Sequence, residues 1–292
     1  MRRIATIFFL FNAFLLWRGD SCLLMAEVGV QVLVGEVTDT PTTGQFHQSC
    51  EVTLKFMGDT VADSFGVREV HVLKAIDDTG RDLLSDKQQV FSFFSPNEKG
   101  RNILEKKVAL KNPSRSAKAI QQLTGRAELF YPSTENGGKV VAKGFLERPG
   151  EFIEAPSMAK WKVKMMYATK EVVEARRKEL AAEREETKQF EQAGEDFLNA
   201  FANLFGTMFS GFWSDKPSLR FLVEDPEKRL VYLEFLDAQG KPLKGAGHSI
   251  GQGLHVYAFE QQPSPHTQLV IYLATPEAIS EVPFELQDVP LP

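Results

Sequence analysis

The chain has 292 residues, 43% hydrophobic and 25% charged, a composition typical of a globular protein with one or two cores. Its formal net charge of -5 excludes the dense basic surface that a nucleic-acid backbone requires, so nucleic acid is not an expected partner. Only Cys22 and Cys50 are present, too few to predict a disulfide framework.

The N-terminal residues predict export. Arg2 and Arg3 precede a nearly unbroken apolar run at residues 4–17. A run of this length is typical of the hydrophobic part of a signal peptide and is short for a membrane span. We expect a signal peptide over residues 1–26, ending at Ala26, and a periplasmic or extracellular location. An uncleaved membrane anchor and a lipoprotein attached through Cys22 are the alternatives.

Residues 27–168 show the two-residue alternation of β-strands. Val52, Leu54 and Phe56 alternate with polar neighbours, and lysines alternate with apolar residues at 160–167. Turn-forming clusters of Asp, Asn, Gly and Pro separate these runs, and no helical pattern lies between them. The pattern favours a first domain that is an antiparallel, immunoglobulin-like β-sandwich.

The periodicity changes after Thr169, which is suited to cap a helix with Glu171 and Glu174 in its first turn. We expect a linker helix over residues 169–214, charged on all sides at first and phenylalanine-rich at its end. Its apolar side forms a candidate docking face: Phe197, Phe201, Phe205, Met208, Phe209 and Phe212. Packing against the chain's own domains is the favoured role of this face, with a homo-oligomer interface and peripheral membrane contact as alternatives.

Alternation returns in residues 215–292, which we predict to form a second, smaller β-sandwich. An internal repeat supports two related domains, because residues 76–83 (IDDTGRDL) line up with residues 236–243 (LDAQGKPL) at the end of a strand pattern. The fold class expected is therefore mainly β, with two antiparallel sandwiches joined by a long helix.

Several segments resemble uncharacterised exported bacterial proteins of the planctomycete type. They are residues 77–83 (DDTGRDL), 110–115 (LKNPSR), 123–129 (LTGRAEL) and the C-terminal residues 282–292. The resemblance covers both β regions and implies an exported protein with tandem β-sandwiches. It implies no activity.

One motif formally matches that of serine hydrolases. Ser249 lies in a G-x-S-x-G sequence at residues 247–251, which in a hydrolase forms a turn between a strand and a helix. The residues that follow read as a strand, and the only Asp after Ser249 is Asp288, beyond His255 and His266. The favoured interpretation is a glycine-rich hairpin loop, with a hydrolase using Ser249 as a remote alternative.

Asp77, Asp78 and Asp82 could ligate calcium, but their spacing is not that of a calcium loop, so an Asp-rich turn is the favoured interpretation. The five histidines are scattered. We therefore predict no catalytic residue, no cofactor and no metal site.

The function expected is that of an exported, non-catalytic binding or envelope-structural protein with an unknown protein or envelope partner. A helix-mediated oligomeric or membrane-associated scaffold is the alternative.

Overall fold

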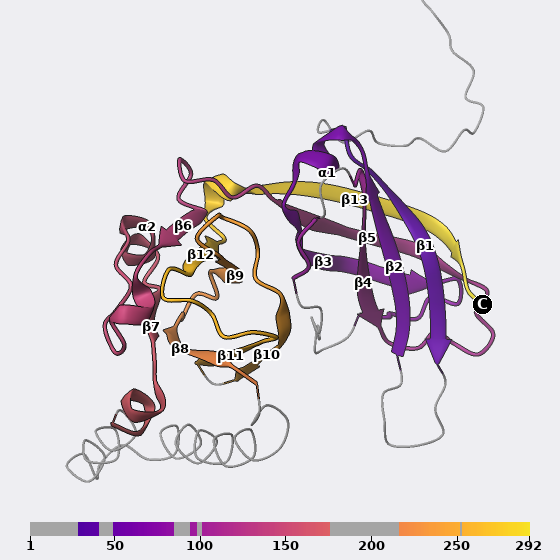
Figure 1. The fold of residues 1–292 in the computed structure, drawn as a ribbon. Helices are drawn as coiled ribbons and strands as arrows, with labels where there is room; N and C mark the ends of the chain where they lie inside the picture. The colour runs from indigo at the N-terminus through magenta and orange to yellow at the C-terminus, as the bar shows by residue number, and fades with distance from the viewer. Residues whose placement is uncertain (1–28, 41–48, 85–93, 98–100, 176–215, 252) are drawn as a thin grey trace, which may run out of the picture.

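The computed structural model describes residues 29–40, 49–84, 94–97, 101–175, 216–251 and 253–292. It shows a mainly β protein in which every paired set of strands is antiparallel, as the alternation predicted (Figure 1). The strands form two sheet pairs, each with a core between its two sheets.

The first sheet pair has the strand orders β1-β2-β4 and β13-β5-β3. Its strands are β1 (Gln31–Thr40), β2 (Ser49–Met57), β3 (Gly66–Asp77), β4 (Ile103–Leu110), β5 (Ala119–Phe130) and β13 (Ile279–Pro290), with a short helix α1 (Asp59–Asp63) after β2. The predicted alternation of Val52, Leu54 and Phe56 is confirmed, because all three are fully buried in this core.

The second sheet pair has the strand orders β6-β12-β9 and β10-β11-β8-β7. Its strands are β6 (Lys139–Ala142), β7 (Lys164–Tyr167), β8 (Ser218–Glu224), β9 (Leu230–Leu236), β10 (Gly245–Gly251), β11 (Leu254–Phe259) and β12 (Gln268–Leu273). Three short helices belong to the same part of the chain: η1 (Phe145–Glu147), α2 (Pro156–Lys160) and η2 (Pro276–Ala278). Lys160 thus ends a helix, and the strand expected at 160–167 is limited to β7.

The predicted internal repeat is confirmed at the turns that follow β3 and β9. Asp77 accepts hydrogen bonds from the backbone N–H groups of Thr79 and Arg81, each at 2.9 Å. Asp237 accepts two bonds of the same length from residues 239 and 241. Gly80 and Gly240 occupy the left-handed region that each turn requires, with φ angles of 88° and 80°.

The repeat extends to the strand orders. The sheet β1-β2-β4 corresponds to β7-β8-β11, and the sheet β13-β5-β3 corresponds to β6-β12-β9. In this correspondence β6 and β13 take equivalent edge positions. Each follows a strand of the opposite sheet pair in sequence, because β6 follows β5 and β13 follows β12. The chain therefore crosses between the sheet pairs twice.

The strand pairing differs from the division at residue 168 that chain order suggested. The C-terminal strand β13, expected in the second sandwich, pairs with β5 over residues 279–290. Strands β6 and β7, expected in the first sandwich, pair with β12 and β8. An alternating strand can bury its apolar side at the edge of either sheet, so periodicity alone does not reveal which edge it joins.

The two crossings lie side by side at the junction. The Tyr131 N–H donates to the Ala278 carbonyl at 2.8 Å, and the Leu273 N–H donates to the Gly138 carbonyl at 2.9 Å. The Thr275 hydroxyl donates to the Asn136 carbonyl at 3.0 Å. These bonds connect the segment 131–138 to the segment 273–278.

An aromatic cluster joins the sheet pairs next to these crossings. Phe65 and Phe130 of the first pair contact Tyr232 and Tyr272 of the second pair, together with Phe94. The rings of Phe65 and Tyr272 are stacked, with centroids 4.3 Å apart. Offset aromatic contacts of this kind stabilise beyond the area they bury.

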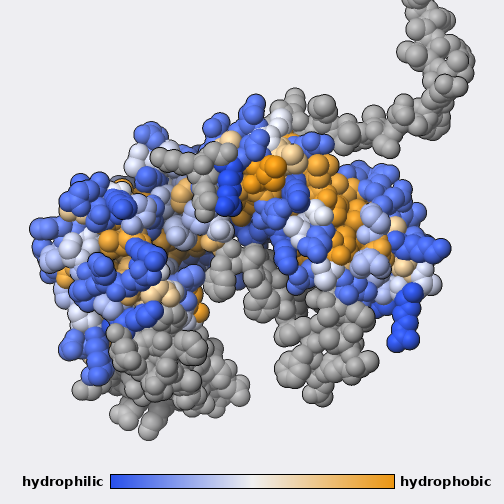
Figure 2. Space-filling model, turned by 45° about the vertical axis from the view of Figure 1, so that its right-hand side comes forward, coloured by the Kyte–Doolittle hydropathy of each residue, from blue (hydrophilic) through white to orange (hydrophobic). Residues whose placement is uncertain are grey.

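The β1 edge of the first core is only partly covered by the described residues. Val32, Val34 and Val37 of β1 pack against the core but are part-buried. Figure 2, which is turned toward the β1 side of the molecule, shows apolar surface on this sheet pair.

The long linker helix is not confirmed. No helix of seven or more residues occurs in the described parts of the chain, where only residues 170–175 of the predicted 169–214 segment are helical. The Thr169 hydroxyl accepts a bond from the Val172 N–H at 3.4 Å, as expected of a cap. Val173 is buried against Leu254. The docking face, from Phe197 to Phe212, lies outside the described residues.

The pairing of β13 with β5 gives a direct prediction. Phe284 of β13 is 7% exposed in the first core, so Phe284→Ala should lower the free energy of unfolding of the first sheet pair by about 3–5 kcal/mol. Hydrogen exchange followed by mass spectrometry should show faster exchange in β2, β3 and β5.

The matched control is Phe235→Ala, because Phe235 is 6% exposed in the second core and should affect β8 and β12 instead. Faster exchange of β12 with unchanged β5 in the Phe284 variant would contradict the observed pairing.

Candidate functional site

A row of three glutamates crosses the outward face of the β13-β5-β3 sheet. In the strand register Glu128 of β5 lies directly opposite Glu69 of β3 on one side and Glu281 of β13 on the other. Like charges in directly opposite positions repel each other. The sheet therefore needs positive groups close to this row.

Arg68 supplies most of that compensation. It is the extra residue of a β-bulge, since Val67 and Glu69 have partners on β5 and Arg68 has none in the register. Its Nε contacts Glu128 Oε2, and its Nη2 lies 3.2 Å from Glu69 Oε2. The third glutamate pairs separately, because Arg126 Nε lies 3.6 Å from Glu281.

Lys106 of β4 is a third positive group, and it interacts with Glu69. It is 8% exposed, and this burial lowers the pKa of its ammonium group, while the negative charge of Glu69 acts in the opposite direction. Glu69 therefore interacts with positive groups from two strands.

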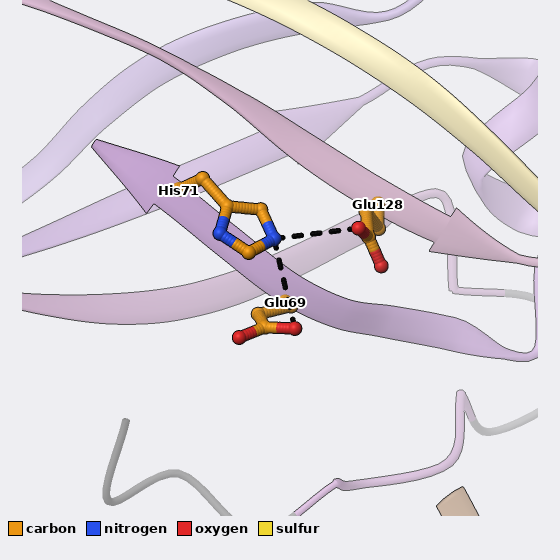
Figure 3. A group of neighbouring side chains, drawn as sticks. All are labelled: Glu69, His71 and Glu128. Atoms are coloured by element: carbon orange, nitrogen blue, oxygen red, sulfur yellow. Dashed lines mark hydrogen bonds and ion pairs between the residues drawn. The ribbon is translucent and has the colours of Figure 1, made fainter. Parts of the chain in front are cut away.

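His71 completes the cluster. It follows Glu69 by two residues on β3, so both side chains leave the same face of the sheet, and Glu128 approaches from β5 (Figure 3). His71 Nε2 lies 3.3 Å from Glu128 Oε1 and 3.6 Å from Glu69 Oε2. One ligand atom from each of the three residues lies within 4.8 Å of the other two, so a single cation could contact all three.

Glu128 is the most buried member, with 9% of its side chain exposed. Burial alone would raise the pKa of its carboxyl group, but the hydrogen bond and charge of Arg68, followed by His71, lower the pKa below its ordinary value. Glu128 is therefore an ionised carboxylate at neutral pH. The cluster offers two carboxylates and an imidazole on a rigid sheet.

This cluster could not be recognised from the sequence. Glu69 and Glu128 become neighbours only through the register of β3 against β5. A weak signal was present, because Glu69 and His71 are polar residues two apart among the valines of a strand.

Ser249 is not at a strand-to-helix turn or in a loop. It lies within β10, an edge strand, and the strand expected after it is confirmed as β11. Ser249 is opposite Val256 and Ile250 is opposite His255 in this hairpin, so Ser249 and His255 leave opposite faces of the sheet. The hairpin does not bring these two side chains together as a nucleophile and base.

Asp77 is a turn-forming residue, as the sequence favoured. Its Oδ1 accepts from the Thr79 and Arg81 N–H groups and from the Thr79 hydroxyl, and its Oδ2 accepts from the Ser114 N–H. Burial alone would raise the pKa of this carboxyl group, but the hydrogen bonds lower it. These donors occupy the oxygens that a calcium ion would need.

Cys50 is fully buried in β2, and burial raises the pKa of its thiol to about 11. Cys50 is thus a small buried apolar residue and not a reactive thiol. Cys22 lies outside the described residues.

Comparison with protein-family models, with curated proteins and with solved structures found no match. Among the described residues, no helix has the length and apolarity needed to cross a membrane.

The turn at Asp77 yields a stability prediction. Asp77→Ala leaves several backbone donors without an acceptor in a buried site, which should lower the free energy of unfolding by about 2–4 kcal/mol. Urea denaturation would measure the loss.

Asp237→Ala is the matched control, because Asp237 accepts the same two turn bonds at a half-buried site and its loss should cost less. Equal losses in the two variants would show that the buried bond from Ser114 contributes nothing.

His255 predicts a pH dependence of stability. Burial lowers the pKa of its imidazole to about 4, with His248 adding to the shift and Asp225 opposing it. The unfolded chain then binds more protons than the folded chain between pH 6.5 and 4. Lowering the pH across this window should reduce the free energy of unfolding by about 3 kcal/mol.

Urea denaturation at pH 7, 5.5 and 4 would measure this loss in the wild type and in His255→Gln, which should lack that component of the pH dependence. His266→Gln, at an exposed position, should behave as the wild type. The same slope in wild type and His255→Gln would refute the assignment.

Proposed function

We propose that the chain is an exported, non-catalytic binding or envelope-structural protein whose two sheet pairs act as one stiff body. The main support for this proposal is that the chain crosses twice between the two sheet pairs. Segments 131–138 and 274–278 run side by side and are hydrogen-bonded to each other, with the aromatic cluster beside them.

Enzymes that close two domains around a substrate do so about hinges, where a few residues absorb a large change of backbone angle. A single linker allows such motion more readily than two bonded crossings. The junction therefore favours the presentation of fixed surfaces over closure, which suits a structural or binding role.

We assign the sheet pairs to immunoglobulin-like sandwiches of the planctomycete-type exported proteins, from the segment resemblance and the repeated turns at Asp77 and Asp237. Export rests on the signal-like residues 1–26. Residues 170–175 form a short helical segment after Thr169, and Val173 of this segment packs against Leu254 of β11.

Two measurements on the tagged chain in a Gram-negative bacterium test the proposal. We expect a mature N-terminus after Ala26 in the periplasmic fraction, and in-cell crosslinking that captures a defined envelope partner. Recovery of the uncleaved chain from the cytoplasm would contradict export.

A turnover screen with ester, glycoside and phosphate substrates tests the non-catalytic role, together with labelling by a fluorophosphonate probe. We expect neither turnover nor labelling. Activity that disappears in Ser249→Ala but persists in Ser280→Ala, a serine on β13, would establish the hydrolase alternative.

A further inference from the structure

We propose that Glu69, His71 and Glu128 form a binding site for one divalent transition-metal ion, and that Zn²⁺ fits it best. The inference goes beyond the proposed function and does not depend on it.

The spacing of the ligand atoms fits a tetrahedral zinc ion. Zinc bonds to nitrogen and oxygen of about 2.0–2.2 Å place neighbouring ligand atoms about 3.3–3.6 Å apart. His71 Nε2 lies 3.3 Å from Glu128 Oε1 and 3.6 Å from Glu69 Oε2. Both distances exceed the optimum of about 2.9 Å for a hydrogen bond from nitrogen to oxygen. The two distances from His71 Nε2 therefore match the spacing of ligands around zinc, and all three ligand atoms lie within 4.8 Å of one another.

The site is open to solvent. Glu69 and Glu128 lie directly opposite each other and bring two carboxylates next to His71, although Arg68 offsets part of their negative charge. Glu69 and His71 are about one quarter exposed, with side-chain values of 27% and 26%, while Glu128 forms the buried base of the cluster. A hydrated ion can therefore approach from the side of Glu69 and His71.

Arg68 is arranged as an outer partner of the site. It binds Oε2 of Glu128 and leaves Oε1, the atom next to His71, facing the centre of the cluster (Figure 3). Carboxylates that bind metals are commonly held in this way by a second hydrogen bond. At Glu69, Arg68 Nη2 lies 3.2 Å from Oε2, the oxygen that would bind the ion, so its positive charge competes with the ion there. We therefore expect an affinity only in the micromolar range.

The ligand types select the metal. Calcium and magnesium prefer shells made only of oxygen, whereas an imidazole with carboxylates suits zinc and its neighbours among the transition metals. Three protein ligands leave the fourth tetrahedral position to water.

Isothermal titration of the untagged, chelator-treated full chain with ZnCl₂ tests the site. We expect saturable binding of one ion per chain at the cluster. His71→Ala and Glu128→Gln should each weaken it at least tenfold. Glu281→Gln is the matched control, because it removes a charge from the same row without removing a ligand, and should change the affinity less than threefold. Cobalt(II) should give the visible absorption of a tetrahedral site, and this absorption should be lost in His71→Ala.

A wild-type chain without saturable zinc binding up to about 1 mM would overturn the proposal, as would His71→Ala binding with wild-type affinity. Thermal unfolding of each variant, with His71→Gln as a milder substitution, checks that a loss of binding is not a loss of fold. A chain that binds zinc and also turns over a substrate would refute the non-catalytic role while leaving the metal site in place.

Discussion

The pairing of β13 with β5 is the interaction on which the rest of the structure depends. It brings the last strand of the chain to a sheet formed by the first half, and places Val282 and Phe284 in the first core. Gly125 of β5 gives the Phe284 ring room to pack against the strand, because a Cβ atom at this position would lie 2.6 Å from the ring. The same connection forces the second crossing between the sheet pairs and aligns it with the first.

The polar face of the β13-β5-β3 sheet depends on this pairing too. Glu281 enters the row beside Glu128 only because β13 lies against β5, and Arg126 then has a carboxylate on its other side. Arg68, the extra residue of the bulge, contacts both Glu69 and Glu128 and offsets the repulsion between these two carboxylates. Packing on the inner side of the sheet and charge balance on its outer side are thus set by one strand register.

Much of the fold could be predicted from local patterns. The buried alternation of Val52 and Phe56 and the matched turns at Asp77 and Asp237 each depend on residues close together in sequence. The partner of β13 could not be predicted, because its alternation suits either sheet edge. The Glu69, His71 and Glu128 cluster could not be predicted either, since three register shifts decide which residues of β3 and β5 face each other.

The topology also sets an order of assembly. Strands β6 to β12 are contiguous in the chain, so the second sheet pair has all its strands once residue 273 has emerged. The first sheet pair begins with β1 but waits for β13 at the C-terminus, and until then the edge of β5 stays open. The half of the protein that is synthesised first is therefore the last to be completed.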